Sequence, residues 1–142
     1  MTPTIQKFSI YFFIAFFVGL FLVISIAQAK DLDDAEICRA AIAAIMGQKL
    51  EGVHFDKEVK QVKYISFAQT PKHSINKFKC SVGESGKIHW ASEYGAWRDG
   101  ELESLVRYEI KDTKLIILEE YNSGAIFKKL YDLNKGKLEE NK

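Results

Sequence analysis

The sequence predicts an α+β domain in which an N-terminal helix packs on an antiparallel meander sheet of about five to six strands, held by one disulfide. Three observations lead to this fold. Apolar residues recur at helical spacing over 37–46 and change to two-residue alternation from Val59 onward. Short connections separate the alternating segments, so neighbours in sequence should pair in the sheet. Two cysteines, one in each kind of segment, can join the helix to the sheet.

The helix is expected to begin at Asp31 or Asp33, whose side chains can cap its first turn, and to end at Gly47. Asp34 and Glu36 suit the positive end of the helix dipole. The apolar positions form one face, which we expect to be buried against the sheet: Ile37, Cys38, Ala41, Ile42, Ile45 and Met46.

Six strands are predicted after a loop over 48–57. They lie at 59–68, 75–82, 87–92, 105–110, 115–121 and 125–133, with turn residues between them. The sheet face away from the helix should be half solvated, or the sheet should close on itself by strong bending. Residues 134–142 are charged and lack apolar anchors, so we expect a flexible tail there.

The N-terminus has the features of a secretory signal. Lys7 precedes an apolar run of about 19 residues, which ends in Ala27-Gln28-Ala29. We interpret residues 1–29 as a signal peptide cleaved after Ala29. The alternative is an uncleaved membrane anchor, because the run approaches the roughly 20 residues that span a bilayer. Under both interpretations the single α+β domain at 30–133 crosses the membrane and is periplasmic or secreted.

Charge limits the class of partner. Cleavage after Ala29 removes Lys7 from the 20 basic residues of the chain, leaving 19 basic residues against 19 acidic ones. This balance argues against nucleic acid, which requires a basic surface. A membrane contact is expected only if the N-terminal segment remains uncleaved.

Cys38 and Cys80 are the only cysteines of the chain. In an exported domain of this size, two cysteines indicate a disulfide. The bridge closes a loop of about 42 residues, which the chain-entropy model makes worth about 4 kcal/mol. The alternative, a reactive thiol or a metal ligand, lacks a Cys-x-x-Cys spacing to support it.

No catalytic or metal-binding motif is evident, so we expect no enzyme activity, cofactor or metal. His54 and Asp56 could offer two metal ligands, but no third ligand is evident. Glu119 and Glu120 are adjacent on a strand and point to opposite faces, so we expect a solvated edge and no catalytic pair. The alternative is a small periplasmic hydrolase or metal-dependent enzyme that uses His54, Asp56 or His89.

The stretch from Lys79 to Arg98 holds both tryptophans and the second cysteine. Here a turn containing Gly95 should present aromatic side chains beside an arginine, residue types that are common at interface hot spots. The expected binding residues are Tyr94, Trp97, Arg98 and His89. The alternative is that the aromatic residues fill the core and cover the open sheet face: Tyr94, Trp97, Tyr108, Tyr121, Phe127 and Tyr131.

In its order of features the chain resembles small exported proteins of Gram-negative bacteria. The resemblance rests on the signal peptide, the helical segment Ile37-Cys38-Arg39-Ala40-Ala41-Ile42-Ala43, a second cysteine on a strand, Ile88-x-Trp90 and Gly95-x-Trp97-Arg98. It covers nearly all of the mature chain and implies no activity. Periplasmic lysozyme inhibitors are similar in size, export and disulfide use, but their inhibitory loop motif cannot be placed on this sequence.

These observations predict a non-enzymatic binding module of the periplasm, acting as an inhibitor or immunity protein on a cell-envelope enzyme. The expected partner is another envelope or secreted protein, with a glycan as the alternative. A structural component of an envelope complex, held by the N-terminal segment, is a further hypothesis.

Overall fold

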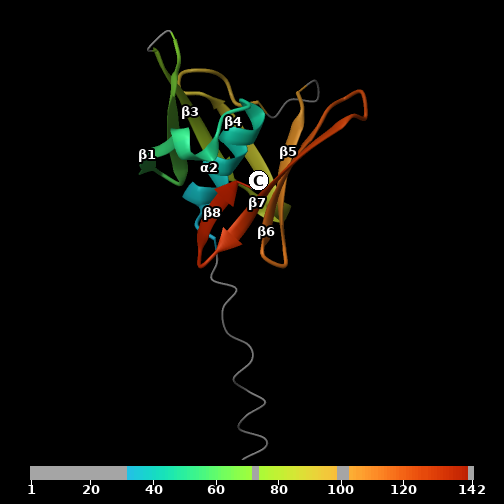
Figure 1. Ribbon diagram of the computed structural model, residues 1–142. Helices are drawn as coiled ribbons and strands as arrows, with labels where there is room; N and C mark the ends of the chain where they lie inside the picture. The colour runs from blue at the N-terminus through green and yellow to red at the C-terminus, as the bar shows by residue number, and fades with distance from the viewer. Residues whose placement is uncertain (1–31, 72–73, 99–102, 141–142) are drawn as a thin grey trace, which may run out of the picture. The chain divides into compact units, whose positions relative to one another are not determined.

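The computed structural model describes residues 32–71, 74–98 and 103–140 of the chain (Figure 1). Residues 32–142 form one compact unit. The expected signal peptide lies outside the described residues. No helix in the described part of the chain is long and apolar enough to cross a membrane.

One α-helix and eight strands make up the described fold. The helix, α2 (Asp34–Ile45), is followed by a single antiparallel sheet in which the strands lie in sequence order. The predicted α+β meander is therefore confirmed, but the expected five to six strands are too few. The strands are β1 (Val53–Val59), β2 (Val62–Gln69), β3 (Ser74–Val82), β4 (Lys87–Ser92), β5 (Leu105–Lys111), β6 (Lys114–Glu120), β7 (Ile126–Asn134) and β8 (Lys137–Glu140).

The first additional strand is β1, in a region where a loop was expected. Only Val53 of β1 is buried, and the pairing register shifts between Phe55 and Lys57, so one extra residue, Asp56, interrupts the alternation. The predicted strand at 59–68 also differs from the structure, because Lys60 and Gln61 form a turn between β1 and β2. Both have positive φ, of 49° and 66°, although neither is the glycine or asparagine typical of such turns.

The second additional strand is β8, within the expected flexible tail. A turn with Gly136 at a φ of 79° returns the chain along β7. Leu138 is partly buried and packs against the core, and its pairing with Leu133 supplies the apolar contact that the charged sequence concealed.

The helix has the predicted boundaries. The Asp33 side chain caps it by accepting a hydrogen bond from the N–H of Ala35 at 3.2 Å, and Gly47 follows it with a φ of 61°. Arg39 joins the helix to the start of the sheet, because its guanidinium donates to the carbonyl oxygens of Val53 and Leu50.

The sheet curves around α2 (Figure 1). We call the face toward α2 the inner face and the opposite one the outer face. The two edges of the sheet, β1 and β8, approach each other, since a Glu140 carboxylate oxygen of β8 accepts a hydrogen bond from the N–H of Leu50, just before β1, at 3.3 Å. Strong bending, one of the two expected solutions for the open face, is thus observed. Among the side chains buried in this enclosure are Ile37, Ile42, Val53, Ile65, Ile88, Val106, Leu115 and Ile117.

The Cys38–Cys80 disulfide is present and joins α2 to the inner face of β3, with 5.9 Å between the two Cα atoms. Both cysteines are fully buried, as are most of the expected apolar positions of the helix. The other two, Ile45 and Met46, are partly buried and pack against the same core.

One charged group is buried at the start of the helix. The inner-face side chain of Lys63 is 6% exposed, and its ammonium lies 3.2 Å from a carboxylate oxygen of Glu58 and 3.7 Å from one of Asp34. Pairing offsets the cost of burying this cation. It also ties the first turn of α2 to β2.

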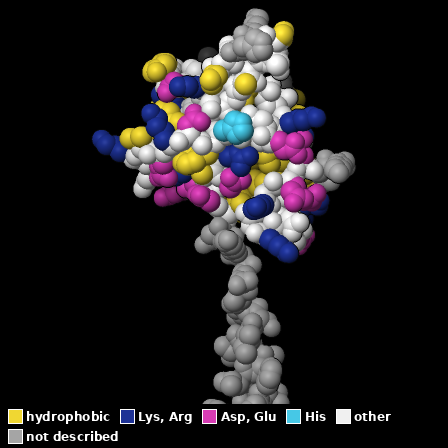
Figure 2. All heavy atoms as spheres, turned by 60° about the vertical axis from the view of Figure 1, so that its left-hand side comes forward, with side chains coloured by type: hydrophobic (Ala, Val, Ile, Leu, Met, Phe, Trp, Pro, Cys, Tyr) yellow, Lys and Arg dark blue, Asp and Glu magenta, His cyan; other side chains and the backbone are white. Residues whose placement is uncertain are grey.

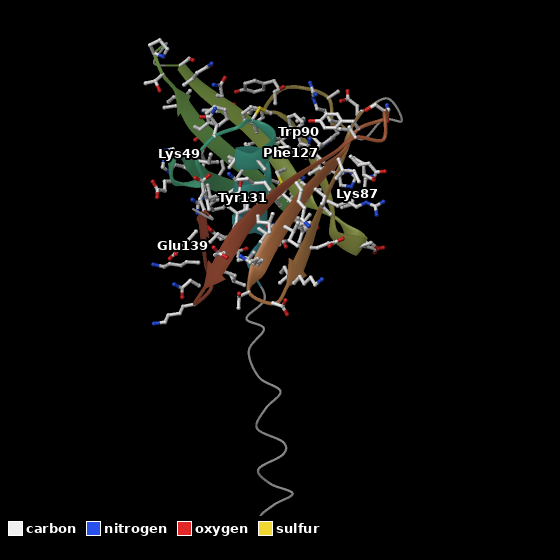
Figure 3. All side chains as sticks on the ribbon, turned by 45° about the vertical axis from the view of Figure 1, so that its right-hand side comes forward. Lys49, Lys87, Trp90, Phe127, Tyr131 and Glu139 are labelled. Carbon is white, nitrogen blue, oxygen red and sulfur yellow. A yellow bond between two sulfur atoms is a disulfide. The ribbon has the colours of Figure 1, made fainter. Side chains whose placement is uncertain are left out.

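Tyr131 of β7 is fully buried and crosses the enclosure to donate a hydrogen bond to the carbonyl oxygen of Ala40 in α2, at 3.1 Å. Figure 3 shows the ring directed toward the helix. Burial, and then the nearby carboxylate of Glu140, raise the pKa of Tyr131 above its ordinary value.

Replacing both cysteines by serine should lower the free energy of unfolding by about 4 kcal/mol, because the unfolded chain regains the entropy of a 42-residue loop. Urea unfolding of the two proteins measures this difference. Adding a reductant to the parent should reproduce the loss and should leave the double variant unchanged. Equal stability with and without reductant would contradict a structural role for the bridge.

Replacing Tyr131 by phenylalanine should cost about 1 kcal/mol at neutral pH, because a buried hydrogen bond is lost. The raised pKa of Tyr131 also predicts a pH dependence. The stability that the protonated Tyr131 side chain contributes is fully present below its ordinary pKa of 10.0. This stability is lost as the pH rises toward and through the raised pKa that Tyr131 has in the folded protein. Urea unfolding between about pH 8 and 11 should show a steeper alkaline decline for the parent than for Tyr131→Phe. Parallel pH profiles would contradict this assignment.

Candidate functional site

The two ends of the sheet are built differently. At one, which we call the turn end, tight connections lie at 60–61, 83–86, 112–113 and 135–136. At the other, the loop end, the connections are 70–73, 93–104 and 121–125. Figure 1 shows the two ends at the bottom and the top of the sheet. Because loops held by a rigid scaffold commonly carry binding residues, the loop end is the candidate functional site.

Exposed apolar side chains gather at the loop end. Eight large hydrophobic residues of the described chain are exposed, and five of them lie on or beside these connections. Such residues mark interaction surfaces when they occur together. The five are Ile75, Tyr94, Tyr121, Ile126 and Phe127.

The segment 93–98 has a defined backbone. Strand β4 pairs with β5 only at Lys87 and Ile88. Beyond these pairs, the N–H of Arg98 donates to the carbonyl oxygen of Trp90 at 2.9 Å, so segment 93–98 lies along β4 in place of β5. The N–H of Gly95 donates to the carbonyl oxygen of Ser92 at 3.0 Å. A Cβ atom at Gly95 would clash with the Ser92 hydroxyl, so a larger residue here would require the Ser92 side chain to rotate.

The four expected binding residues do not form one cluster. Tyr94 projects into solvent and is 94% exposed. Trp97 is half-buried, and the Lys79 ammonium lies 4.8 Å from the centre of its ring. Lys79 belongs to the outer face, as does His89, which is half-buried and pairs in register with Ser81.

Arg98 lies on the inner side. Its guanidinium is 4.8 Å from the centre of the Trp90 ring, and Trp90 pairs in register with the disulfide-bonded Cys80. A guanidinium nitrogen lies 3.4 Å from a carboxylate oxygen of Glu103. The indole N–H of Trp90 is buried without a hydrogen-bond partner among the described residues. Arg98 therefore covers the core at the loop end, while Trp97 covers the opposite face.

A polar cluster that the sequence did not indicate lies nearby. Glu119 is only 6% exposed, and its two carboxylate oxygens accept hydrogen bonds from Ser104 at 2.6 Å and from Tyr121 at 2.8 Å. The expectation of a solvated edge holds for Glu120, which is exposed, and is wrong for Glu119. The available signal was the alternation of Glu119 with Leu115 and Ile117, which places it on the inner face. The hydrogen bond to Glu119 raises the pKa of Tyr121.

The expected alternative metal ligands have other contacts. His54 pairs in register with Ser66, and the Ser66 hydroxyl donates to Asp56 at 2.8 Å. Within the described ranges, no three side chains of histidine, cysteine, aspartate or glutamate come together to hold a metal ion.

Acidic and basic side chains are interspersed on the surface that Figure 2 shows, with apolar side chains between them. Comparison with protein-family models, curated proteins and solved structures gives no match to the chain. The resemblance to exported proteins of Gram-negative bacteria therefore stays a prediction, and arguments about function rest on the geometry.

Replacing Glu119 by glutamine should lower the pKa of Tyr121 toward its ordinary value of 10.0, because the carboxylate that stabilises the protonated phenol is lost. An NMR titration of the tyrosine ring signals measures the pKa. Ser104→Ala, which keeps the carboxylate, serves as the control and should leave the Tyr121 pKa raised. An unchanged pKa in Glu119→Gln would contradict the assigned hydrogen bond.

Proposed function

We propose that this chain is a non-enzymatic binding module of the periplasm or the extracellular space, and that its loop end binds another envelope or secreted protein. In this role it acts as an inhibitor or immunity protein for a cell-envelope enzyme. The observation that carries the proposal is the 94% exposure of Tyr94 on a hydrogen-bonded turn. An exposed tyrosine on a defined backbone offers contact area at a small entropic cost.

The surroundings of Tyr94 support a protein contact. Trp97, on the same segment as Tyr94, has the Lys79 ammonium of β3 over its ring. The Arg98 guanidinium lies over the Trp90 ring. Tyrosine, tryptophan and arginine are the residue types enriched at interface hot spots. In this proposal Tyr94 and Trp97 contact the partner, Arg98 holds the base of the segment, and His89 flanks the contact on the outer face.

The compartment is supported by covalent chemistry. A fully buried disulfide persists in oxidising environments such as the periplasm and the extracellular space. An inhibitor there meets its target outside the reducing cytosol, and the cross-link between α2 and β3 keeps the sheet that bears segment 93–98 folded.

The test is capture of a partner from an envelope extract, followed by titration of the captured protein against Tyr94→Ala. This substitution should weaken binding at least about tenfold, as expected for a central aromatic side chain. Ile110→Ala, an exposed apolar residue at the turn end, is the matched control and should keep the parent affinity. Unchanged affinity in Tyr94→Ala, or equal losses in the two variants, would contradict the proposed site.

A further inference from the structure

Among the described residues, ion pairs are common on the inner side of the sheet and rare on the outer face, where Lys114 with Asp132 is the exception. The pairs on the inner face and its rim are Arg39 with Glu36, Lys63 with Glu58, Arg98 with Glu103, and Lys129 with Glu140. On the outer face, seven exposed or half-buried cations of β1 to β7 have no carboxylate partner among the described residues, and one of them, Lys111, lies at the turn end beside residues 112–113. We call the other six the outer cations: Lys57, Lys77, Lys79, Lys87, Arg107 and Lys128.

Strand register places the outer cations in rows. One row runs across β1 to β4 as Lys57, Tyr64, Lys79 and Ala91, and Lys77 lies two residues along β3 from it. This row crosses three strand spacings, or about 14 Å. The second row runs across β4 to β7 and consists of Lys87, Arg107, Leu118 and Lys128.

Two of the outer cations are held in position by aromatic rings. The Lys57 ammonium lies 4.9 Å from the centre of the Tyr64 ring, and the Lys79 ammonium lies 4.8 Å from that of Trp97. A cation over a ring loses conformational freedom before any ligand arrives. These two charges are therefore partly preorganised, which lowers the entropic cost of binding an anion.

Carboxylates are fewer on this face. Within the described residues of β1 to β7, the same strands as for the cations, its acidic side chains are Asp56, Glu109, Glu120 and Asp132, and Asp132 is paired with Lys114. Asp56 accepts a hydrogen bond from Ser66. The nearly neutral chain therefore has a local excess of positive charge, which attracts anions to this face.

We propose that the outer face of the sheet binds an acidic polysaccharide through the outer cations. An extended chain with a negative group on each sugar can contact several spread lysines at once, and the weak contacts then combine. The aliphatic stems of lysine and the edges of Tyr64 and Trp97 offer apolar surface to the sugar rings.

Two other anionic partners fit less well. Single-stranded nucleic acid stacks its bases on free aromatic rings, whereas a lysine ammonium lies over each of these two rings. An anionic membrane is bound by basic residues together with apolar side chains that insert. Most exposed apolar side chains of this sheet lie at the loop end.

The experiment titrates the purified protein, in the form that its host produces, with polygalacturonate, which carries one carboxylate per sugar. Neutral dextran is the uncharged control. The triple variant Lys57→Gln, Lys79→Gln, Lys87→Gln removes three outer cations. The matched control variant Lys49→Gln, Lys129→Gln, Lys135→Gln removes the same charge from the inner face and from connections between elements, and Figure 3 shows Lys49 far from Lys87.

Binding of polygalacturonate but not dextran is expected, and it should weaken as salt is added. The outer-cation variant should lose at least about tenfold in affinity and the control variant less than about twofold. A third variant with arginine at the same three outer positions keeps the charge and should stay within about twofold of the parent. Tyr94→Ala should bind polygalacturonate like the parent, so this proposal and the proposed function can fail separately.

Several outcomes would overturn the proposal. They are absence of binding by the parent, equal losses in the two glutamine variants, and equal or tighter binding to an oligothymidylate of matched charge. Equal or tighter binding to vesicles of phosphatidylcholine and phosphatidylglycerol in equal parts would also assign the outer cations to another partner.

Discussion

The contact between one helix and one curved sheet determines the rest of this structure, and the Cys38–Cys80 disulfide lies at its centre. A single helix of 12 residues cannot cover a flat sheet of eight strands, so the sheet bends around it. The hydrogen bond between Leu50 and Glu140 and the one from Tyr131 to Ala40 hold the two halves of the sheet to the helix region. The disulfide and the burial of apolar side chains therefore stabilise the same contact between the helix and the sheet.

The turn end and the loop end of the sheet also differ, because the connections at one end are tight turns and those at the other are mostly longer. Tight turns at one end keep neighbouring strands in register, whereas the loop end contains the partial separation of β4 from β5. Where β5 no longer pairs with β4, the backbone of Arg98 hydrogen-bonds to β4 in its place. The Arg98 side chain lies over Trp90. The hydrogen bonds that hold segment 93–98 to β4, from Arg98 to Trp90 and from Gly95 to Ser92, leave Tyr94 exposed to solvent. The incomplete pairing of β4 with β5 thus creates the loop-end surface that we propose as the binding site.

Charge is distributed according to face. Cations near the enclosed side have carboxylate partners, as Lys63 and Arg39 show, because desolvated charges are costly when unpaired. Most outer-face cations stay solvated and need no partner for stability. A formal net charge near zero therefore conceals two different surfaces, and the composition that argued against nucleic acid does not describe the outer face.

Local sequence determined the helix limits, the position of most strands and the disulfide. Asp33, Gly47 and the alternation around Cys80 act through near neighbours, so pattern alone was sufficient to predict them. Strand β8 and the Lys60–Gln61 turn escaped prediction because pairing with β7 and β2 stabilises them, not their own residue types.

The candidate site was predicted only in part. The sequence indicated Tyr94, Trp97 and Arg98, but only the tertiary structure decided that Trp97 and Arg98 lie on opposite faces. It likewise buried Glu119 beside Ser104 and Tyr121 and aligned the outer cations in rows. The rows depend on the register between neighbouring strands, which composition and spacing do not set. The Glu119 cluster depends on where the chain before β5 and after β6 places Ser104 and Tyr121.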